Sequence, residues 1–181
     1  MAIGRRGAAR RGFSTGRLTK ENSVYQRALV PLDGSTTAEG ALPFILQIAG
    51  PLGLDVALLR VVIPAPGAAA VELGPVALEN TNKLCAEAEA YLIAFATELR
   101  ANSIRVTTHV RRGEPAQEIL ACARDSKADL IIMTTHGRTG VARLLFGSVA
   151  EAVLRHADIP LLLMRQTQAE MASRGPWQPL R

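Results

Sequence analysis

Short aliphatic runs alternate with helical patterns along most of the chain, and this alternation constrains the fold more than any other feature. The runs cover residues 27–33, 55–62, 104–110, 128–133 and 160–165. Between them, apolar residues at helical spacing predict helices over about 36–49, 76–101, from 115 onward and over 147–156. Nearly continuous apolar strands separated by helices are typical of a parallel sheet covered on both faces. The sequence therefore predicts a doubly wound α/β fold, a five-stranded parallel sheet with helices on both faces.

Two helix starts carry the residue pattern of a capping box, in which a Ser or Thr is followed three residues later by Glu. The first pair is Thr36 with Glu39, and the second is Ser148 with Glu151. In such a box each side chain accepts a hydrogen bond from a backbone N–H of the first turn. Pro115 stands where a first helical turn tolerates proline.

Charge is distributed unevenly along the chain. The net charge is +5, with 21 basic residues against 16 acidic ones. Residues 1–20 contain six of the basic residues and no acidic one, so the remainder has a net charge of −1. We therefore expect a disordered Arg-rich extension over 1–24, a domain over 25–165 and a tail over 166–181, and no specific nucleic-acid binding. The extension has two alternative explanations: it is an electrostatic anchor for nucleic acid or anionic lipid, or it results from a misassigned start codon.

Cysteine content and hydropathy exclude further classes. Cys85 and Cys122 are the two cysteines, and they form no Cys-x-x-Cys pair, which argues against a zinc or redox motif and suits a reducing compartment. No apolar run approaches the roughly 18–20 residues needed to span a bilayer. We expect a cytoplasmic protein without membrane association.

Candidate binding residues follow the predicted strands. In doubly wound sheets, ligands bind beyond the carboxyl ends of the strands, where the winding reverses. Asp33-Gly34-Ser35 follows the first strand, and Thr134 to Gly140 follows the fourth. The second segment leads to Gly147-Ser148 at a helix start, where free N–H groups and the helix dipole favour a phosphate. Ser148 is equally interpretable as a helix cap, and Asp33 as an ordinary turn residue.

These segments together resemble the universal stress protein family. The resemblance covers roughly residues 25–165 and is carried by Leu29-Val30-Pro31-Leu32-Asp33-Gly34-Ser35, Val61, Gly113-Glu114-Pro115 and the stretch 133–149. Nucleotide-binding members have Gly-x-x-Gly, nine residues, and then Gly with Ser or Thr. Gly137 and Gly147-Ser148 fit that frame, whereas Thr134 replaces its first glycine. A side chain at that position limits close approach of a ligand to the backbone.

The resemblance implies a Rossmann-like fold of the adenine nucleotide alpha hydrolase type and a nucleotide site. Asp33 would contact the ribose, the main chain of Val61 would read adenine, and the phosphates would bind at four residues, Gly137, Gly147, Ser148 and Val149. The other binding residues expected are Pro31, Met133, His136 and Arg138. The ligand would be ATP or ADP, with Mg²⁺ or Mn²⁺ bound through the phosphates. The family also commonly dimerises through its last strand, here 160–165.

The implied function is that of a dimer that binds ATP or ADP and acts in stress-response signalling or regulation. The alternative is a dimeric protein-interaction module that binds no nucleotide. The sequence has no Walker motif and no Gly-x-Gly-x-x-Gly, and the Gly12-Phe-Ser14-Thr-Gly16 match lacks the strand and helix that a nucleophile elbow requires. No histidines have metal-ligand spacing, and no residue is placed to orient an attacking water. We expect no catalytic residues, no protein-held metal and at most slow ATP hydrolysis.

Overall fold

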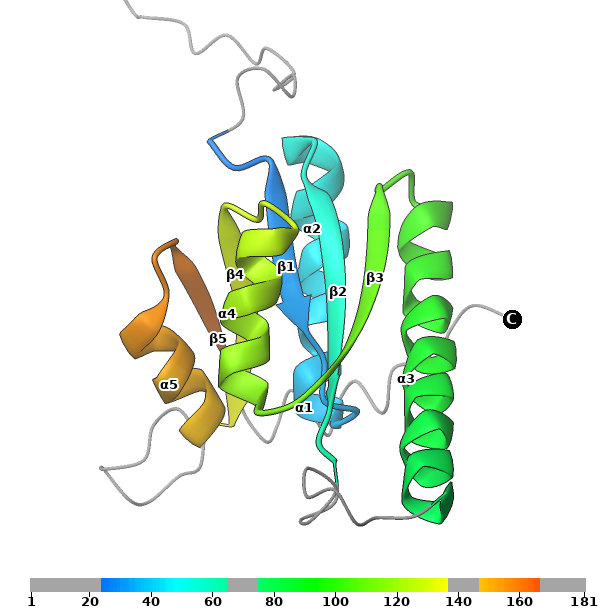
Figure 1. The fold of residues 1–181 in the computed structure, drawn as a ribbon. Coiled ribbons are helices and arrows are strands. Elements are labelled where there is room, and N and C mark those ends of the chain that lie inside the picture. The colour runs from blue at the N-terminus through cyan, green and yellow to red at the C-terminus, as the bar shows by residue number, and fades with distance from the viewer. Residues whose placement is uncertain (1–23, 65–74, 137–146, 167–181) are drawn as a thin grey trace, which may run out of the picture.

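A computed structural model describes residues 24–64, 75–136 and 147–166, and these form a five-stranded sheet (Figure 1). The spatial order is β3-β2-β1-β4-β5, and every neighbouring pair is parallel. The strands are β1 (Arg27–Pro31), β2 (Asp55–Val62), β3 (Val106–Arg112), β4 (Leu130–His136) and β5 (Leu161–Gln166). The predicted doubly wound α/β fold is confirmed.

Helices cover both faces of this sheet. They are α1 (Thr36–Glu39), α2 (Ala41–Leu52), α3 (Pro75–Ala101), α4 (Pro115–Asp125) and α5 (Ser148–His156). One apolar core lies between the sheet and α2 and α3, and a second lies between the sheet and α4 and α5 (Figure 1). Consecutive residues of β2 enter different cores, because Leu58 belongs to the first and Leu59 to the second, each fully buried. This explains why consecutive residues are apolar in the middle of β1 and over Val56–Leu59 of β2.

Two strands begin two residues later than the sequence pattern predicts. β3 runs over 106–112 rather than 104–110, and β4 over 130–136 rather than 128–133. In both cases a residue with positive φ, Ser103 (62°) or Lys127 (54°), lies two positions beyond the last residue of the preceding helix. The next residue then donates its N–H back to the helix, from Ile104 to Leu99 O (3.1 Å) and from Ala128 to Ala123 O (2.9 Å). These apolar residues close the helix ends and do not enter the strands.

The first helical segment also differs from the prediction. Ser35 is the N-cap of α1, and its Oγ accepts a hydrogen bond from the Ala38 N–H at 3.1 Å, so the capping box starting at Thr36 is wrong. The extended backbone of Ser35 places its hydroxyl over the first turn. The Glu39 carboxylate instead accepts a hydrogen bond from Tyr91 Oη at 3.1 Å. α1 ends after four residues, and α2 continues through Pro51 until Gly53, whose φ is 63°.

The pairing of β1 changes along its length. β1 pairs with β2 over five residue pairs but with β4 over only two, Ala28 with Leu130 and Leu29 with Ile131. β1 lies between strands whose connections run in opposite directions across the sheet, which makes this junction the point where the winding reverses. Beyond Leu29 the two strands are unpaired, so the carboxyl end of the sheet is open at this point.

Asp129 fixes the other end of this junction. Its Oδ1 accepts the N–H of Arg27 at 2.9 Å, and its Oδ2 accepts the N–H of Gln26 at 2.8 Å. We predict that Asp129→Ala lowers the free energy of unfolding by about 2 kcal/mol, because two charge-assisted hydrogen bonds are lost at a half-buried position. Urea denaturation measures the change. The matched control, Asp158→Ala at an exposed position, should change it by less than about 0.5 kcal/mol, and equal effects of the two variants would contradict the prediction.

Candidate functional site

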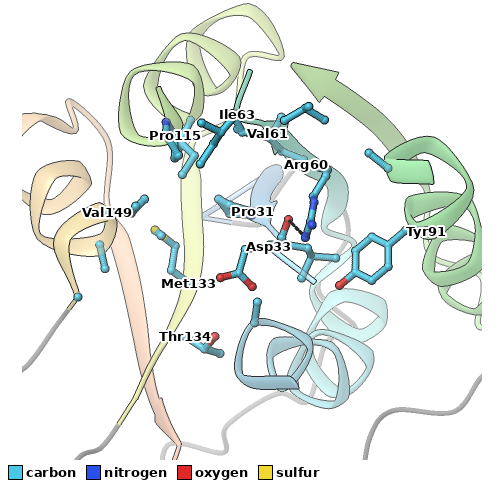
Figure 2. A pocket seen from close by; sticks show the side chains of 18 of the residues that line it. Pro31, Asp33, Arg60, Val61, Ile63, Tyr91, Pro115, Met133, Thr134 and Val149 are labelled. Atoms are coloured by element: carbon cyan, nitrogen blue, oxygen red, sulfur yellow. Dashed lines mark hydrogen bonds between the residues drawn. The ribbon is translucent and has the colours of Figure 1, made fainter. Parts of the chain in front are cut away.

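A cavity of about 990 Å³ lies at the carboxyl ends of the strands, where β1 and β4 diverge (Figure 2). It is at the upper end of the size of small-molecule pockets. Seven of the ten residues expected to bind a ligand line it: Pro31, Asp33, Val61, Met133, Gly147, Ser148 and Val149. His136 ends β4, whereas Gly137 and Arg138 lie outside the described residues. The structure thus brings the two predicted loops to one cavity.

Asp33 combines a turn role with exposure to the cavity. Its Oδ1 accepts the N–H of Ser35 at 2.9 Å, which closes the turn after β1. Within the described parts of the chain, no protein donor bonds to Oδ2. Figure 2 shows the carboxylate directed toward Met133 and away from Arg60. The side chain therefore serves the turn through one oxygen and leaves the other as an acceptor for a ligand.

The start of α5 forms another side of the cavity. Gly147 is the N-cap with φ 55° and ψ 149°, and Ser148 is the first residue of the helix. The capping box predicted for Ser148 and Glu151 is wrong, because the Ser148 hydroxyl makes no cap hydrogen bond and Glu151 instead forms an ion pair with Arg155 at 2.6 Å. The first turn of α5 consequently presents backbone N–H groups without a side-chain cap. Such a helix terminus favours an anion.

The main chain of Val61 also borders the open end of the sheet. The Leu32 N–H donates to Leu59 O, so the backbone groups of alternate β2 residues, including Val61, point toward β1. β1 ends at Pro31, and among the described residues none beyond it forms a backbone hydrogen bond with Val61. The peptide groups of Val61 therefore remain available at the edge of the cavity.

Thr134 lies in the cavity lining with its hydroxyl already engaged. Its Oγ1 donates a hydrogen bond to Thr37 O at 2.7 Å, which ties β4 to α1. Figure 2 places the side chain beside α1, below the Asp33 carboxylate. The side chain thus contributes to the α1 side of the pocket, where the family frame has a glycine.

Sequence reasoning missed a polar cluster on the α3 side of the cavity. The Arg60 guanidinium lies 5.4 Å from the centre of the Tyr91 ring, and Tyr91 Oη donates to Glu39. Burial and the Glu39 charge raise the pKa of Tyr91, so its hydroxyl remains protonated and donates. Burial also raises the pKa of Glu39, against the opposing effects of the Tyr91 hydrogen bond and the Arg60 charge. The one sequence sign of this cluster is a charged residue within the apolar run of β2.

The described residues contain no group of three or more His, Cys, Asp or Glu side chains that could hold a metal ion. Over the same residues, no helix is both long and apolar enough to cross a membrane. What the cavity offers a ligand is a carboxylate acceptor, uncapped N–H donors and apolar walls.

Comparisons with known proteins agree on one family. The sequence model of the Universal stress protein family matches residues 24–165. Universal stress protein MJ0531 of Methanocaldococcus jannaschii is 30% identical over 161 residues, which cover 82% of this chain and 86% of that protein.

Solved structures show the same fold. That of MJ0577, from the same organism, has a TM-score of 0.67 and 32% identity, with 78% of this chain and 96% of that one covered. That of UspA from Lactobacillus plantarum has a TM-score of 0.68 and 25% identity, with 80% and 100% covered. Two more distant structures with this fold hold nucleotides. One is a universal stress protein in complex with cAMP, with a TM-score of 0.52 and 24% identity, and the match covers 78% of this chain and 98% of that one. The other is a universal stress protein family protein from Arabidopsis thaliana with AMP bound, with a TM-score of 0.56 and 14% identity, and the match covers 82% of this chain and 97% of that one.

The Thr134 hydrogen bond can be tested by stability. We predict that Thr134→Val, which keeps the shape but removes the hydroxyl, lowers the free energy of unfolding by about 1–2 kcal/mol, because the carbonyl of the buried Thr37 loses a donor. Thr134→Ser keeps the hydroxyl and should lose less than half as much. Urea denaturation followed by circular dichroism compares the two, and a serine variant as unstable as the valine variant would count against the bond.

Proposed function

The chain belongs to the universal stress protein family, and from this premise we propose that it binds an adenine nucleotide, ATP or ADP, in the cavity at the open end of the sheet. One observation carries the proposal: the Asp33 carboxylate and the uncapped start of α5 border the same cavity. A nucleotide needs an acceptor for its ribose hydroxyls and donors for its phosphates, and these two elements supply them. The nucleotide-bound structures that share this fold support the same ligand class.

The proposed orientation follows from the chemistry of each wall. The phosphates bind at Gly147, Ser148 and Val149, where N–H groups and the positive end of the α5 dipole meet. The ribose hydroxyls donate to the free oxygen of Asp33. Adenine lies against the apolar wall and pairs with the exposed peptide groups of Val61. Pro31 and Met133 complete the apolar wall, and His136, Gly137 and Arg138 belong to the same proposed site.

The donor set of the described residues fits a divalent ion that is held by the nucleotide. No cluster of three acidic or metal-ligating side chains lies among these residues, and Mg²⁺ commonly binds through phosphates with few protein ligands. We therefore place Mg²⁺ or Mn²⁺ on the phosphates. Its chemistry there would be charge neutralisation.

We propose a binding and signalling role in the stress response rather than a dedicated enzymatic one, with at most slow hydrolysis. The protein would act as a homodimer that pairs along β5. In support, β5 is an edge strand of the sheet, and its apolar residues Leu161 to Met164 are only partly buried. An edge strand with free backbone groups is a template for pairing with a second chain.

Gly147 tests the phosphate site. Its φ of 55° with ψ of 149° is a conformation that side-chain-bearing residues rarely adopt, although a Cβ there would meet no heavy atom within 4 Å. We predict that Gly147→Val shifts the start of α5 and weakens ATP binding about fivefold or more through backbone strain of about 1–3 kcal/mol. Isothermal titration calorimetry with ATP and Mg²⁺ measures the loss. Gly50→Ala, in α2 and with open space around it, is the control and should bind as the wild type does.

The ligand itself is identified by mass spectrometry of the purified wild-type protein. Adenine nucleotide that co-purifies supports the proposal. Unchanged ATP affinity in Gly147→Val contradicts the phosphate assignment, and a consistently empty dimer without ATP affinity supports the alternative, a protein-interaction module.

The dimer is tested at the outer edge of β5. Pro160 O accepts the Ile131 N–H, so by alternation the N–H of Leu163 points away from β4. We predict that Leu163→Pro removes this outward donor and shifts the protein from dimer to monomer in sedimentation equilibrium. Leu163→Ala loses a comparable part of the side chain but keeps the N–H, and it should remain dimeric. Dimers in both variants would contradict pairing along β5.

A further inference from the structure

Arg60 occupies a position where the strand pattern calls for an apolar residue. Val56, Leu58 and Val62 precede and follow it at alternate positions of β2, and the first two are core residues on the α2 and α3 face. Arg60 is half-buried, and within the described residues it has no carboxylate within 4.0 Å. Partial burial of a cation without an ion pair costs free energy. Such a residue needs other favourable contacts, and the structure shows which ones it makes.

The Arg60 guanidinium contacts the turn that carries Asp33 and the ring of Tyr91. Arg60 Nη1 donates to Leu32 O at 3.5 Å, directly before Asp33. A Cβ added to Gly34, directly after Asp33, would lie 2.7 Å from the same Nη1, so the guanidinium lies against the backbone of that glycine. With φ at 79°, Gly34 has the conformation that the turn requires and leaves space for Arg60.

We propose that Arg60 is a positioning residue that holds the Asp33 carboxylate against the ribose of a bound nucleotide. The inference rests on the proposed nucleotide site and adds a specificity determinant to it. Arg60 acts through Asp33, because its contacts are to the backbone on either side of Asp33, while the Asp33 carboxylate is directed away from it, toward Met133 (Figure 2). Its function is to make binding depend on the ribose hydroxyls.

Tyr91 holds the guanidinium in this place. Its ring stacks beneath Arg60 at 5.4 Å, a distance at which cation–π attraction is favourable. The ring is held by an edge contact with Phe95 at 4.7 Å and by the hydrogen bond from its hydroxyl to Glu39. α3 therefore supports the turn from behind, through Arg60, and also holds α1 in place.

Charge favours the same arrangement. Besides burial, the Asp33 charge contributes to raising the pKa of Glu39, and the Arg60 charge opposes this effect. Arg60 therefore offsets the repulsion between the two carboxylates that the turn and α1 bring near each other. An uncharged residue at position 60 would remove both this effect and the hydrogen bond to Leu32.

The test compares ATP with 2′,3′-dideoxy-ATP, which keeps the base and phosphates but lacks both ribose hydroxyls. Calorimetry on the full chain gives both affinities. Wild-type protein should favour ATP by roughly tenfold or more, the effect of at least one hydrogen bond to a charged acceptor. Arg60→Met should reduce this preference to less than about threefold with the dideoxy-ATP affinity unchanged. Asp33→Ala should do the same, and the double variant should lose no more than either single one.

Two further variants separate positioning from general damage. Arg100→Met removes a guanidinium that donates to a backbone carbonyl, Val106 O at 2.8 Å, away from the cavity, and should keep the wild-type preference. Arg60→Lys keeps the charge without the planar guanidinium and should retain part of the preference. It also replaces Arg60→Met if that variant fails to fold, as judged by circular dichroism.

Each remaining outcome has a definite meaning. If Arg60→Met keeps the wild-type preference, or weakens ATP and dideoxy-ATP equally, Arg60 does not act through Asp33 and the inference is wrong while the nucleotide site stands. A wild-type protein that binds both ligands equally overturns the role of Asp33 and the inference with it. Absence of binding to either ligand overturns the proposed function as well.

Discussion

The short pairing between β1 and β4 determines where this protein can hold a ligand. Two residue pairs join these strands, and beyond Leu29 and Ile131 they diverge. A parallel sheet normally satisfies its backbone groups between neighbours, so a divergence leaves peptide groups and side chains facing a common space. The seven expected binding residues that line the cavity lie at or beside this divergence. The position of the cavity is therefore determined by the strand topology, and the side chains determine only what it can bind.

Local patterns were enough to predict the fold. Each strand was expected from apolar periodicity, and so were the helices, except that α1 and α2 were expected as one helix. The order of elements implied the parallel, doubly covered sheet that is observed. The errors occur where a single backbone conformation decides the outcome. Ser103 and Lys127 adopt positive φ and divert Ile104 and Ala128 from the strands into helix ends. Apolar periodicity cannot register such a change, because both environments bury the residue.

The site was predictable only in part, for a related reason. Asp33 and Gly147 were found because turn residues after strands mark the ligand edge of this fold and because their motif resembles a family. Arg60 and Tyr91 were missed because their partnership spans two elements that are distant in sequence, and neither has a local motif. The cap of α1 was placed at Thr36 rather than Ser35 because the pattern cannot distinguish neighbouring hydroxyl residues. The sequence pattern predicts the helices and strands, but it does not predict which side chains of different elements contact each other, as Arg60 and Tyr91 do.

The brevity of α1 has a consequence for the order in which the molecule assembles. A helix of four residues has only about one internal turn, and helix nucleation in isolation is unfavourable. Its stability must come from β4 through Thr134 and from α3 through Tyr91, which are remote in the chain. We infer that α1 becomes ordered only after the sheet has formed and α3 has docked. The side of the cavity that α1 forms would then be among the last structures to form during folding and among the first to be lost during unfolding.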